Sequence, residues 1–133
     1  MYLVDTNVLS EAHRKSPEAL AWLRSAGSEN IWLSVITLGE ISLGIERQRR
    51  KNPDFALRLA EWLTRIRREF ANKILPVSDE IALQWGRIAA IRSRGEADGI
   101  IAATALIHGL AVVTRNTADF ADAGVRVVDP WAP

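Results

Sequence analysis

The apolar residues of this chain fall into short runs that alternate with longer segments of helical spacing. The short runs are typical of buried strands, and they lie at residues 1–4, 31–33, 73–77, 110–114 and 125–129. Between them, apolar residues recur three or four positions apart, as on one face of a helix. These predicted helices cover residues 16–27, 34–48, 52–72, 78–95 and 96–109.

Helix start and stop signals mark the same segments. Ser16 and Asn52 each precede a proline at the first helical position, where the missing N–H breaks no helical hydrogen bond. Ser78 is a further predicted N-cap, and Gly27 and Gly109 follow the last residues of their helices. The capping residues and the hydrophobic spacing therefore predict the same boundaries.

The alternation of short strands with helices predicts an α/β fold, with a parallel central sheet of short strands flanked by helices on both faces. No internal repeat, low-complexity segment or linker interrupts the pattern, so we expect a single domain over residues 1–133. The pattern does not determine the order of the strands in the sheet.

Composition narrows the class of protein. Hydrophobic residues make up 48% and charged residues 25%, as in ordinary soluble domains. No apolar run reaches the roughly 18 residues of a membrane span, and the start lacks a signal-peptide pattern, so we expect a cytoplasmic protein without membrane contact. Cysteine is absent, which excludes disulfides and thiolate metal sites. The net charge of +1 gives no strong overall attraction to nucleic acid.

Four acidic residues fall at matching places in this pattern. Asp5 follows the first strand, Glu40 lies about two turns into the helix after the second, Asp98 is in a first helical turn, and Asp119 follows a strand. In a parallel sheet such places collect at one edge. Two like charges 4 Å apart repel by about 4 kcal/mol at an intermediate dielectric, which a divalent cation would relieve. All-oxygen ligands suit Mg²⁺ or Mn²⁺.

Each acid taken singly has an ordinary structural explanation. Asp5 could cap a helix over the residues that follow it, and Asp98 could stabilise a helix dipole. Asp119 could form an Asx-type turn. Glu40 has mostly small or apolar neighbours, so it is either the one polar spot on a buried face or a functional acid. The joint placement of the four acids favours a functional site.

These residues together resemble the PIN-domain family, most closely its VapC-type toxins, including FitB-like members. The resemblance spans nearly the whole chain, in the order and spacing of four motifs. One departure is Gly99, where the family often has alanine after the acid. The four motifs are "LVDTNVLSE" with Asp5, "SVITLGEISLGI" with Glu40, "ADGIIAATA" with Asp98, and "TRNTADF" with Asp119.

The resemblance implies an endoribonuclease that depends on Mg²⁺ or Mn²⁺, paired as a toxin with a small antitoxin and assembled as a homodimer. It implies catalytic and metal-binding roles for Asp5, Glu40, Asp98 and Asp119. The expected accessory polar residues are Thr6, Asn7, Thr114 and Asn116. Phosphodiester hydrolysis fits such a site, because a metal lowers the pKa of water and neutralises phosphate charge. One or two ions are both compatible with these residue types.

Two other functions remain as alternatives. A phosphoacceptor receiver domain is also a small α/β fold with acids at strand ends, but it needs a lysine where this chain has Arg115. A catalytically inactive PIN-like binding module would keep the fold without needing all four acids. A dinucleotide site is disfavoured because the chain has no G-x-G-x-x-G motif.

Several conspicuous residues are interpreted structurally. His13 is expected in a solvated loop, and the basic run at residues 46–51 could either bind RNA phosphates or form a solvated helix end. Trp62 and Trp85 lie on apolar helical faces, which favours core or dimer packing over base stacking.

Overall fold

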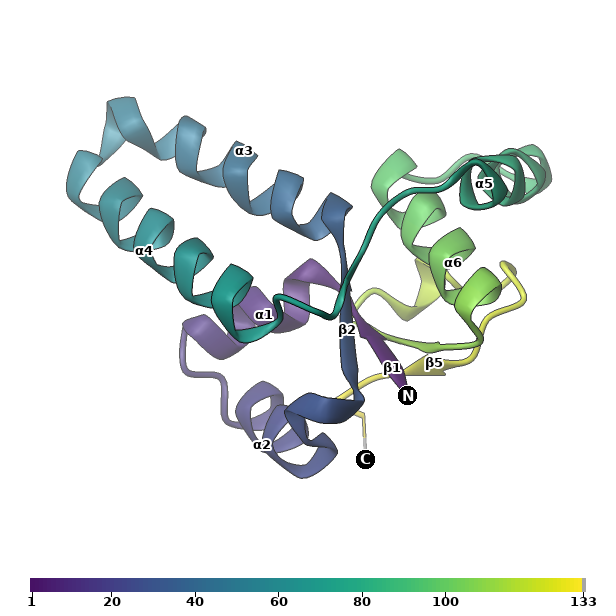
Figure 1. Ribbon diagram of the computed structural model, residues 1–133, viewed down its shortest axis with the longest axis horizontal. Helices are drawn as coiled ribbons and strands as arrows, with labels where there is room; N and C mark the ends of the chain where they lie inside the picture. Colours follow the sequence, from purple (N-terminus) through teal and green to yellow (C-terminus); the bar gives the residue numbers. More distant parts are fainter. Residues whose placement is uncertain (133) are drawn as a thin grey trace.

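The computed structural model describes residues 1–132 and forms an open α/β sandwich (Figure 1). None of the helices in this range is long and apolar enough to cross a membrane. The strands are β1 (Tyr2–Val4), β2 (Ile31–Ser34), β3 (Ile74–Leu75), β4 (Ala111–Val113) and β5 (Val127–Val128). The α-helices are α1 (Thr6–His13), α2 (Pro17–Ala26), α3 (Val35–Lys51), α4 (Pro53–Glu69), α5 (Asp79–Ile91) and α6 (Glu96–His108), with 3₁₀ turns η1 (Ser28–Asn30) and η2 (Thr117–Asp119).

The five strands are parallel and lie in the order β3-β2-β1-β4-β5. Strand β1 is therefore central, with Leu3 paired to Trp32 on one side and to Val112 on the other. From β1 the sheet extends through β2 to β3 on one side and through β4 to β5 on the other. The direction in which strands are added therefore reverses between β1 and β4. In open α/β sheets, ligands bind outside the carboxyl ends of the strands at such a reversal.

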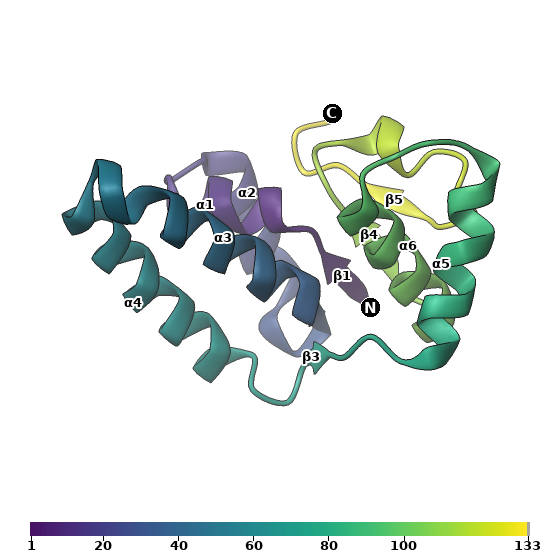
Figure 2. The same ribbon diagram turned by 90° about the horizontal axis from the view of Figure 1, so that it is seen from above.

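Helices cover both faces of the sheet, as the alternation predicted. Leu3 packs into a cluster with Ile81, Ile88 and Ile101 of α5 and α6. The next residue, Val4, points to the opposite face and belongs to a second cluster with residues of α1 to α4. Figure 2 shows the two groups of helices on either side of the strands. The predicted α/β architecture with a parallel central sheet is confirmed.

The predicted caps form the expected hydrogen bonds. The side chains of Ser16, Asn52 and Ser78 accept from backbone N–H groups three residues ahead, at 3.4, 3.1 and 3.2 Å. Gly109 ends α6 with a φ of +67°, which glycine adopts without steric cost.

Several details differ from the predictions. The helix predicted over residues 78–95 ends at Ile91, and the helix predicted over residues 34–48 continues to Lys51. The strand predicted at residues 73–77 shortens to Ile74–Leu75, because Pro76 has no N–H to donate to a neighbouring strand. His13 was expected in a solvated loop, and this is wrong: it is the last residue of α1 and is half-buried. Its ring stacks on Trp62 with centroids 4.4 Å apart, so apolar contact with α4 extends the helix to this position.

Candidate metal and nuclease site

Asp5 lies at the centre of the site, where β1 meets α1. Its backbone N–H donates to Val113 of the neighbouring strand at 2.8 Å, so it lies at the end of a paired strand. Its side-chain Oδ1 also accepts from the N–H of Thr6 at 2.8 Å and thereby caps α1. Both interpretations of the sequence therefore apply to one residue: Asp5 is a helix cap and a strand-end carboxylate. It is only 3% exposed.

A polar network at the end of β4 holds the second oxygen of Asp5. The buried Thr114 hydroxyl donates to Oδ2 at 2.8 Å, and the Asn7 amide donates to the same oxygen at 3.2 Å. Thr114 in turn accepts from Asn7 and from the N–H of Asn116, at 3.2 and 3.0 Å. The N–H of Arg115 donates to the Asn7 side-chain oxygen at 3.1 Å. Asp5 is therefore fixed by residues more than 100 positions away in the sequence.

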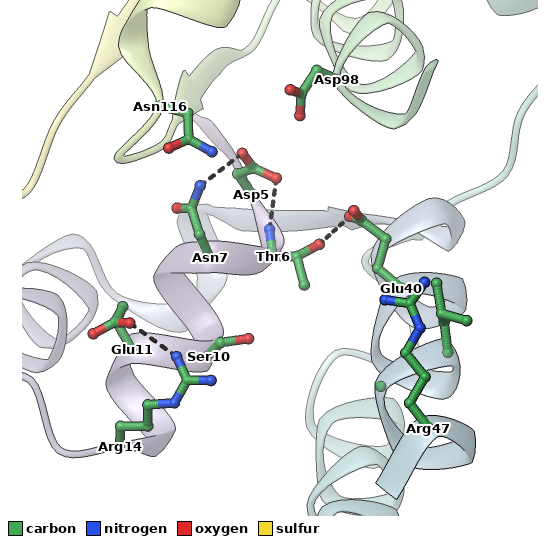
Figure 3. Close-up of a pocket in the computed structure, with 12 residues that line it drawn as sticks. Asp5, Thr6, Asn7, Ser10, Glu11, Arg14, Glu40, Arg47, Asp98 and Asn116 are labelled. Atoms are coloured by element: carbon green, nitrogen blue, oxygen red, sulfur yellow. Dashed lines mark hydrogen bonds and ion pairs between the residues drawn. The ribbon is translucent and has the colours of Figure 1, made fainter. Parts of the chain in front are cut away.

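Glu40 reaches the same region from α3. It accepts from the Thr6 hydroxyl at 2.6 Å (Figure 3). That hydroxyl also lies 3.1 Å from the hydroxyl of the buried Thr37. Thr6 thus connects the carboxylate on α3 to the residue directly after Asp5. The predicted accessory residues Thr6, Asn7 and Thr114 all bond to one of the acids or to one another.

Asp98 approaches from the opposite side, in the first turn of α6. Burial raises its pKa to about 7, and the charges of Asp5, Asp119 and Glu40, with a hydrogen bond to Asp119, act in the same direction. Burial also raises the pKa of Asp5; hydrogen bonds from Thr114 and Thr6 oppose this, while Glu40 and Asp119 add to it. Asp5 and Asp98 therefore lie within electrostatic range of each other and of both Glu40 and Asp119.

Asp5, Glu40 and Asp98 line an open cleft of about 410 Å³ at the carboxyl edge of the sheet (Figure 3). Asp119 and Thr114 do not line it; Thr114 lies buried behind Asp5, and Asp119 lies beside Asp98. The predicted residues that line the cleft are Asp5, Thr6, Asn7, Glu40, Asp98 and Asn116.

Two arginines lie at the cleft. Arg47 belongs to the basic run at residues 46–51, which was predicted either to bind RNA phosphates or to form a solvated helix end, whereas Arg14 was not singled out from the sequence. Arg47 lines the cleft from α3, and Arg14 lines it from the position directly after α1. Arg14 is paired with Glu11 at 3.0 Å, whereas no ion pair of Arg47 occurs among residues 1–132. Arg47 lies seven positions after Glu40, which is two helical turns, so the spacing alone could have placed both on one helix face.

The oxygen atoms of the four acids can be compared with the ligands that a divalent cation requires. In the described part of the chain, no cationic side chain forms an ion pair with any of the four acids. No ion pair within the described chain thus offsets their mutual repulsion, and all the donors are oxygen, which suits Mg²⁺ or Mn²⁺. As the side chains stand within residues 1–132, no three such groups are arranged to hold one ion. Mg²⁺ usually keeps several waters and takes one or two carboxylates directly, so the residues fit an ion held partly through water.

Gly99, the departure from the family pattern, has a structural reason. A β-carbon at this position would lie 2.9 Å from Cδ1 of Trp85 on α5. The indole therefore occupies the space that an alanine side chain would need. Trp85 packs directly beside the residue that follows Asp98, and the missing methyl group allows α5 and α6 to approach closely there.

Comparison with known proteins agrees with this fold. Residues 2–125 match the PIN domain family. The sequence is 38% identical to Toxin FitB of Neisseria gonorrhoeae, over 98% of this chain and 99% of that protein. It is 34% identical to VapC ribonuclease Y4jK of Sinorhizobium fredii, over 100% of this chain and 99% of the relative. The crystal structure of FitAcB from N. gonorrhoeae matches with a TM-score of 0.91 and 38% identity, over 100% of both chains. The chain therefore belongs to the PIN-domain family.

Proposed function

We propose that residues 1–133 form a single PIN domain that acts in the cytoplasm as the toxin of a VapBC-type toxin–antitoxin pair, by cleaving RNA as a metal-dependent endoribonuclease. The observation that carries this proposal is the convergence of four acids, without a paired cation in the described chain, at the carboxyl edge of the sheet. The names of the two relatives, a toxin and a VapC ribonuclease, support the same activity.

Asp5, Glu40, Asp98 and Asp119 are the proposed ligands of Mg²⁺ or Mn²⁺, some directly and some through water. When bound, the ion would activate water and neutralise charge on the phosphate. The chain's own contribution is to fix the ligands. Thr114 and Asn7 hold one oxygen of Asp5, while the Thr6 N–H holds the other. Asn116 lines the cleft and is available to bind a phosphate or a water.

The experiment that tests this function is RNA cleavage by the purified, antitoxin-free chain. Total cellular RNA is incubated with the protein in EDTA, Mg²⁺ or Mn²⁺, and the new RNA ends are mapped. We expect cleavage only with a divalent cation, at a restricted set of positions. A receiver-like domain would instead leave RNA intact and accept a phosphoryl group on an aspartate, and an inactive binding module would do neither.

Arg47 is proposed to bind a phosphate of the RNA beside the acids, because it lines the cleft without an ion-pair partner in the described chain. Arg47→Ala should lower kcat/KM for RNA about tenfold, mainly through KM, since a hydrogen bond to a charged group contributes about 1.5–3 kcal/mol. The matched control is Arg50→Ala, which lies one helical turn further along α3 and does not line the cleft. Equal kinetics for the two variants would contradict this role.

The antitoxin is proposed to occupy a groove that is continuous with the cleft. This groove has a volume of about 400 Å³ and lies between α1, α3 and α4. It shares Thr6, Ser10, Arg14, Glu40 and Gly44 with the cleft, so one segment of polypeptide could extend from one into the other. The side chains that make it apolar are Ile41, Phe55, Leu59 and Trp62. An amphipathic segment would bury its apolar side chains there.

A homodimer is also proposed, and the structure limits where its contact can lie. Ile81 and Ile88 are fully buried within the monomer, so this face of α5 serves the core and is not free for a partner. Leu83 and Ile91, on the outer side of α5, are 64% and 60% exposed. We expect light scattering at micromolar concentration to give the mass of a dimer, and Leu83→Glu to shift it toward the monomer. A monomer mass for the unsubstituted chain would contradict the proposal.

A further inference from the structure

The connection between α5 and α6 carries two arginines that reach the loop holding Asp119. Arg92 donates to the carbonyl of Ala118 at 2.7 Å and forms an ion pair with Asp122 at 2.8 Å. Arg94 donates to the carbonyl of Asp119 itself at 2.8 Å and lies 3.0 Å from the other oxygen of Asp122. The two side chains thus tie the loop after β4 to the segment that leads into α6.

The two arginines differ in burial. The side chain of Arg92 is 38% exposed, as is usual for a surface ion pair, whereas that of Arg94 is 2% exposed. Moreover, Nε of Arg94 is buried without a hydrogen-bond partner in the described chain, and Nη2, although it lies 3.0 Å from the carboxylate of Asp122, is not in hydrogen-bond geometry with it. Burying a guanidinium that is only partly satisfied costs free energy, so stability alone does not account for its position. The burial of Arg94 is better explained by the groups that its side chain holds in place.

Arg94 joins the two elements that carry Asp98 and Asp119. Its Cδ atom lies 4.0 Å from the point where a β-carbon of Gly99 would be, so its aliphatic stem runs along the first turn of α6, next to Asp98. Its head group fixes the carbonyl of Asp119 and thereby the peptide plane that follows this residue. Phe120, the next residue, is buried and also holds this loop, but its side chain has no polar group that could bind α6.

We propose that Arg94 is a positioning residue that holds the carboxylate of Asp119 beside that of Asp98 at the spacing required for binding a divalent cation. This inference rests on the proposed function. Groups that orient metal ligands from behind typically contribute 10- to 100-fold to metal affinity or activity. Arg92 holds the same loop from the surface, but through Ala118 and Asp122 rather than through Asp119. It therefore provides a matched control.

The test measures Mn²⁺ binding to the antitoxin-free chain by the electron paramagnetic resonance signal of free Mn²⁺, together with RNA cleavage and melting temperature. Arg94→Met keeps the aliphatic stem and removes the head group. We expect it to weaken Mn²⁺ affinity about tenfold, with cleavage partly recovered at high Mn²⁺. Arg94→Lys, which can still donate to one carbonyl, should fall between Arg94→Met and the unsubstituted chain. Arg92→Met should change Mn²⁺ affinity less than about twofold.

If Arg94→Met is too unstable to purify, the comparison of Arg94→Lys with Arg92→Lys decides the question in the same way. An Arg94 variant that melts earlier but binds Mn²⁺ as tightly as the unsubstituted chain would overturn the inference and leave Arg94 a purely structural residue. Failure of the proposed function looks different: the unsubstituted chain would then neither bind Mn²⁺ nor cleave RNA, and Arg94 would have no metal ligands to position.

Discussion

Replacing Asp98 by asparagine is expected to abolish metal-dependent RNA cleavage, with a loss of at least about a hundredfold, because the variant removes one charged ligand of an ion that contributes several kcal/mol to the transition state. Asp5→Asn should have a similar effect. The matched control is Asp54→Asn, which also removes an acid from a first helical turn but lies on α4, outside the cleft. Cleavage of RNA by Asp98→Asn at the unsubstituted rate would contradict the assignment.

The same variant should retain the fold and become more stable without metal. Because the pKa of Asp98 is raised from 3.8 to about 7, the native protein binds this proton more tightly than the unfolded chain does. The free energy of unfolding therefore falls as pH rises from about 4 to about 7. Asparagine carries no charge, so in EDTA at pH 8 Asp98→Asn should melt at a higher temperature than the unsubstituted chain. At pH 4 the melting temperatures of the variant and the unsubstituted chain should converge. A variant that melts at a lower temperature than the unsubstituted chain at pH 8 would exclude net repulsion at this position.

The second large effect concerns inhibition by the antitoxin. A basic residue placed among the four acids would compete with the divalent cation and block the phosphate at the same time. We therefore expect the cognate antitoxin to carry an arginine or lysine in its C-terminal segment that contacts Asp5, Glu40 or Asp98, while its apolar side chains lie in the adjoining groove. Substituting that basic residue by alanine should restore RNA cleavage to the complex.

Binding and inhibition can be separated in this experiment. Most of the contact area should come from the apolar groove, so the alanine variant of the antitoxin should lose affinity only modestly. Isothermal titration measures the affinity, and RNA cleavage by the same complex measures the inhibition. A variant complex that binds tightly and stays inactive would show that the antitoxin acts otherwise, by covering the RNA path or distorting the site.

Local signals along the sequence were sufficient for most of the fold. Serine or asparagine caps followed by proline, and glycine after the last turn, placed the helices because capping depends on neighbouring residues alone. The order of the strands could not be obtained in this way, since pairing β1 with β4 joins segments more than 100 residues apart. The length of β3 was overestimated because it depends on pairing with β2 and on Pro76, which has no N–H to donate.

The acids of the site were identified from their places at strand ends, but what holds them was not. No local pattern links Thr114 to Asp5, because the contact exists only once β4 lies beside β1. Arg94 is the extreme case, since the sequence shows only an arginine in a basic connecting segment, while the structure shows it buried against Asp119. The glycine at position 99 is likewise explained only by the structure, in which Trp85 occupies the space that a side chain there would need.

The central claim is that these acids form one site for a divalent cation. An anomalous difference map from crystals of the antitoxin-free chain soaked in Mn²⁺ at pH 8 tests it most directly, because Asp98, with a pKa of about 7, is then ionised. We predict a peak in the cleft at coordination distance from Asp5 or Asp98, and its loss in crystals of Asp98→Asn. A cleft without a peak at millimolar Mn²⁺, or an identical peak in the variant, would contradict the claim.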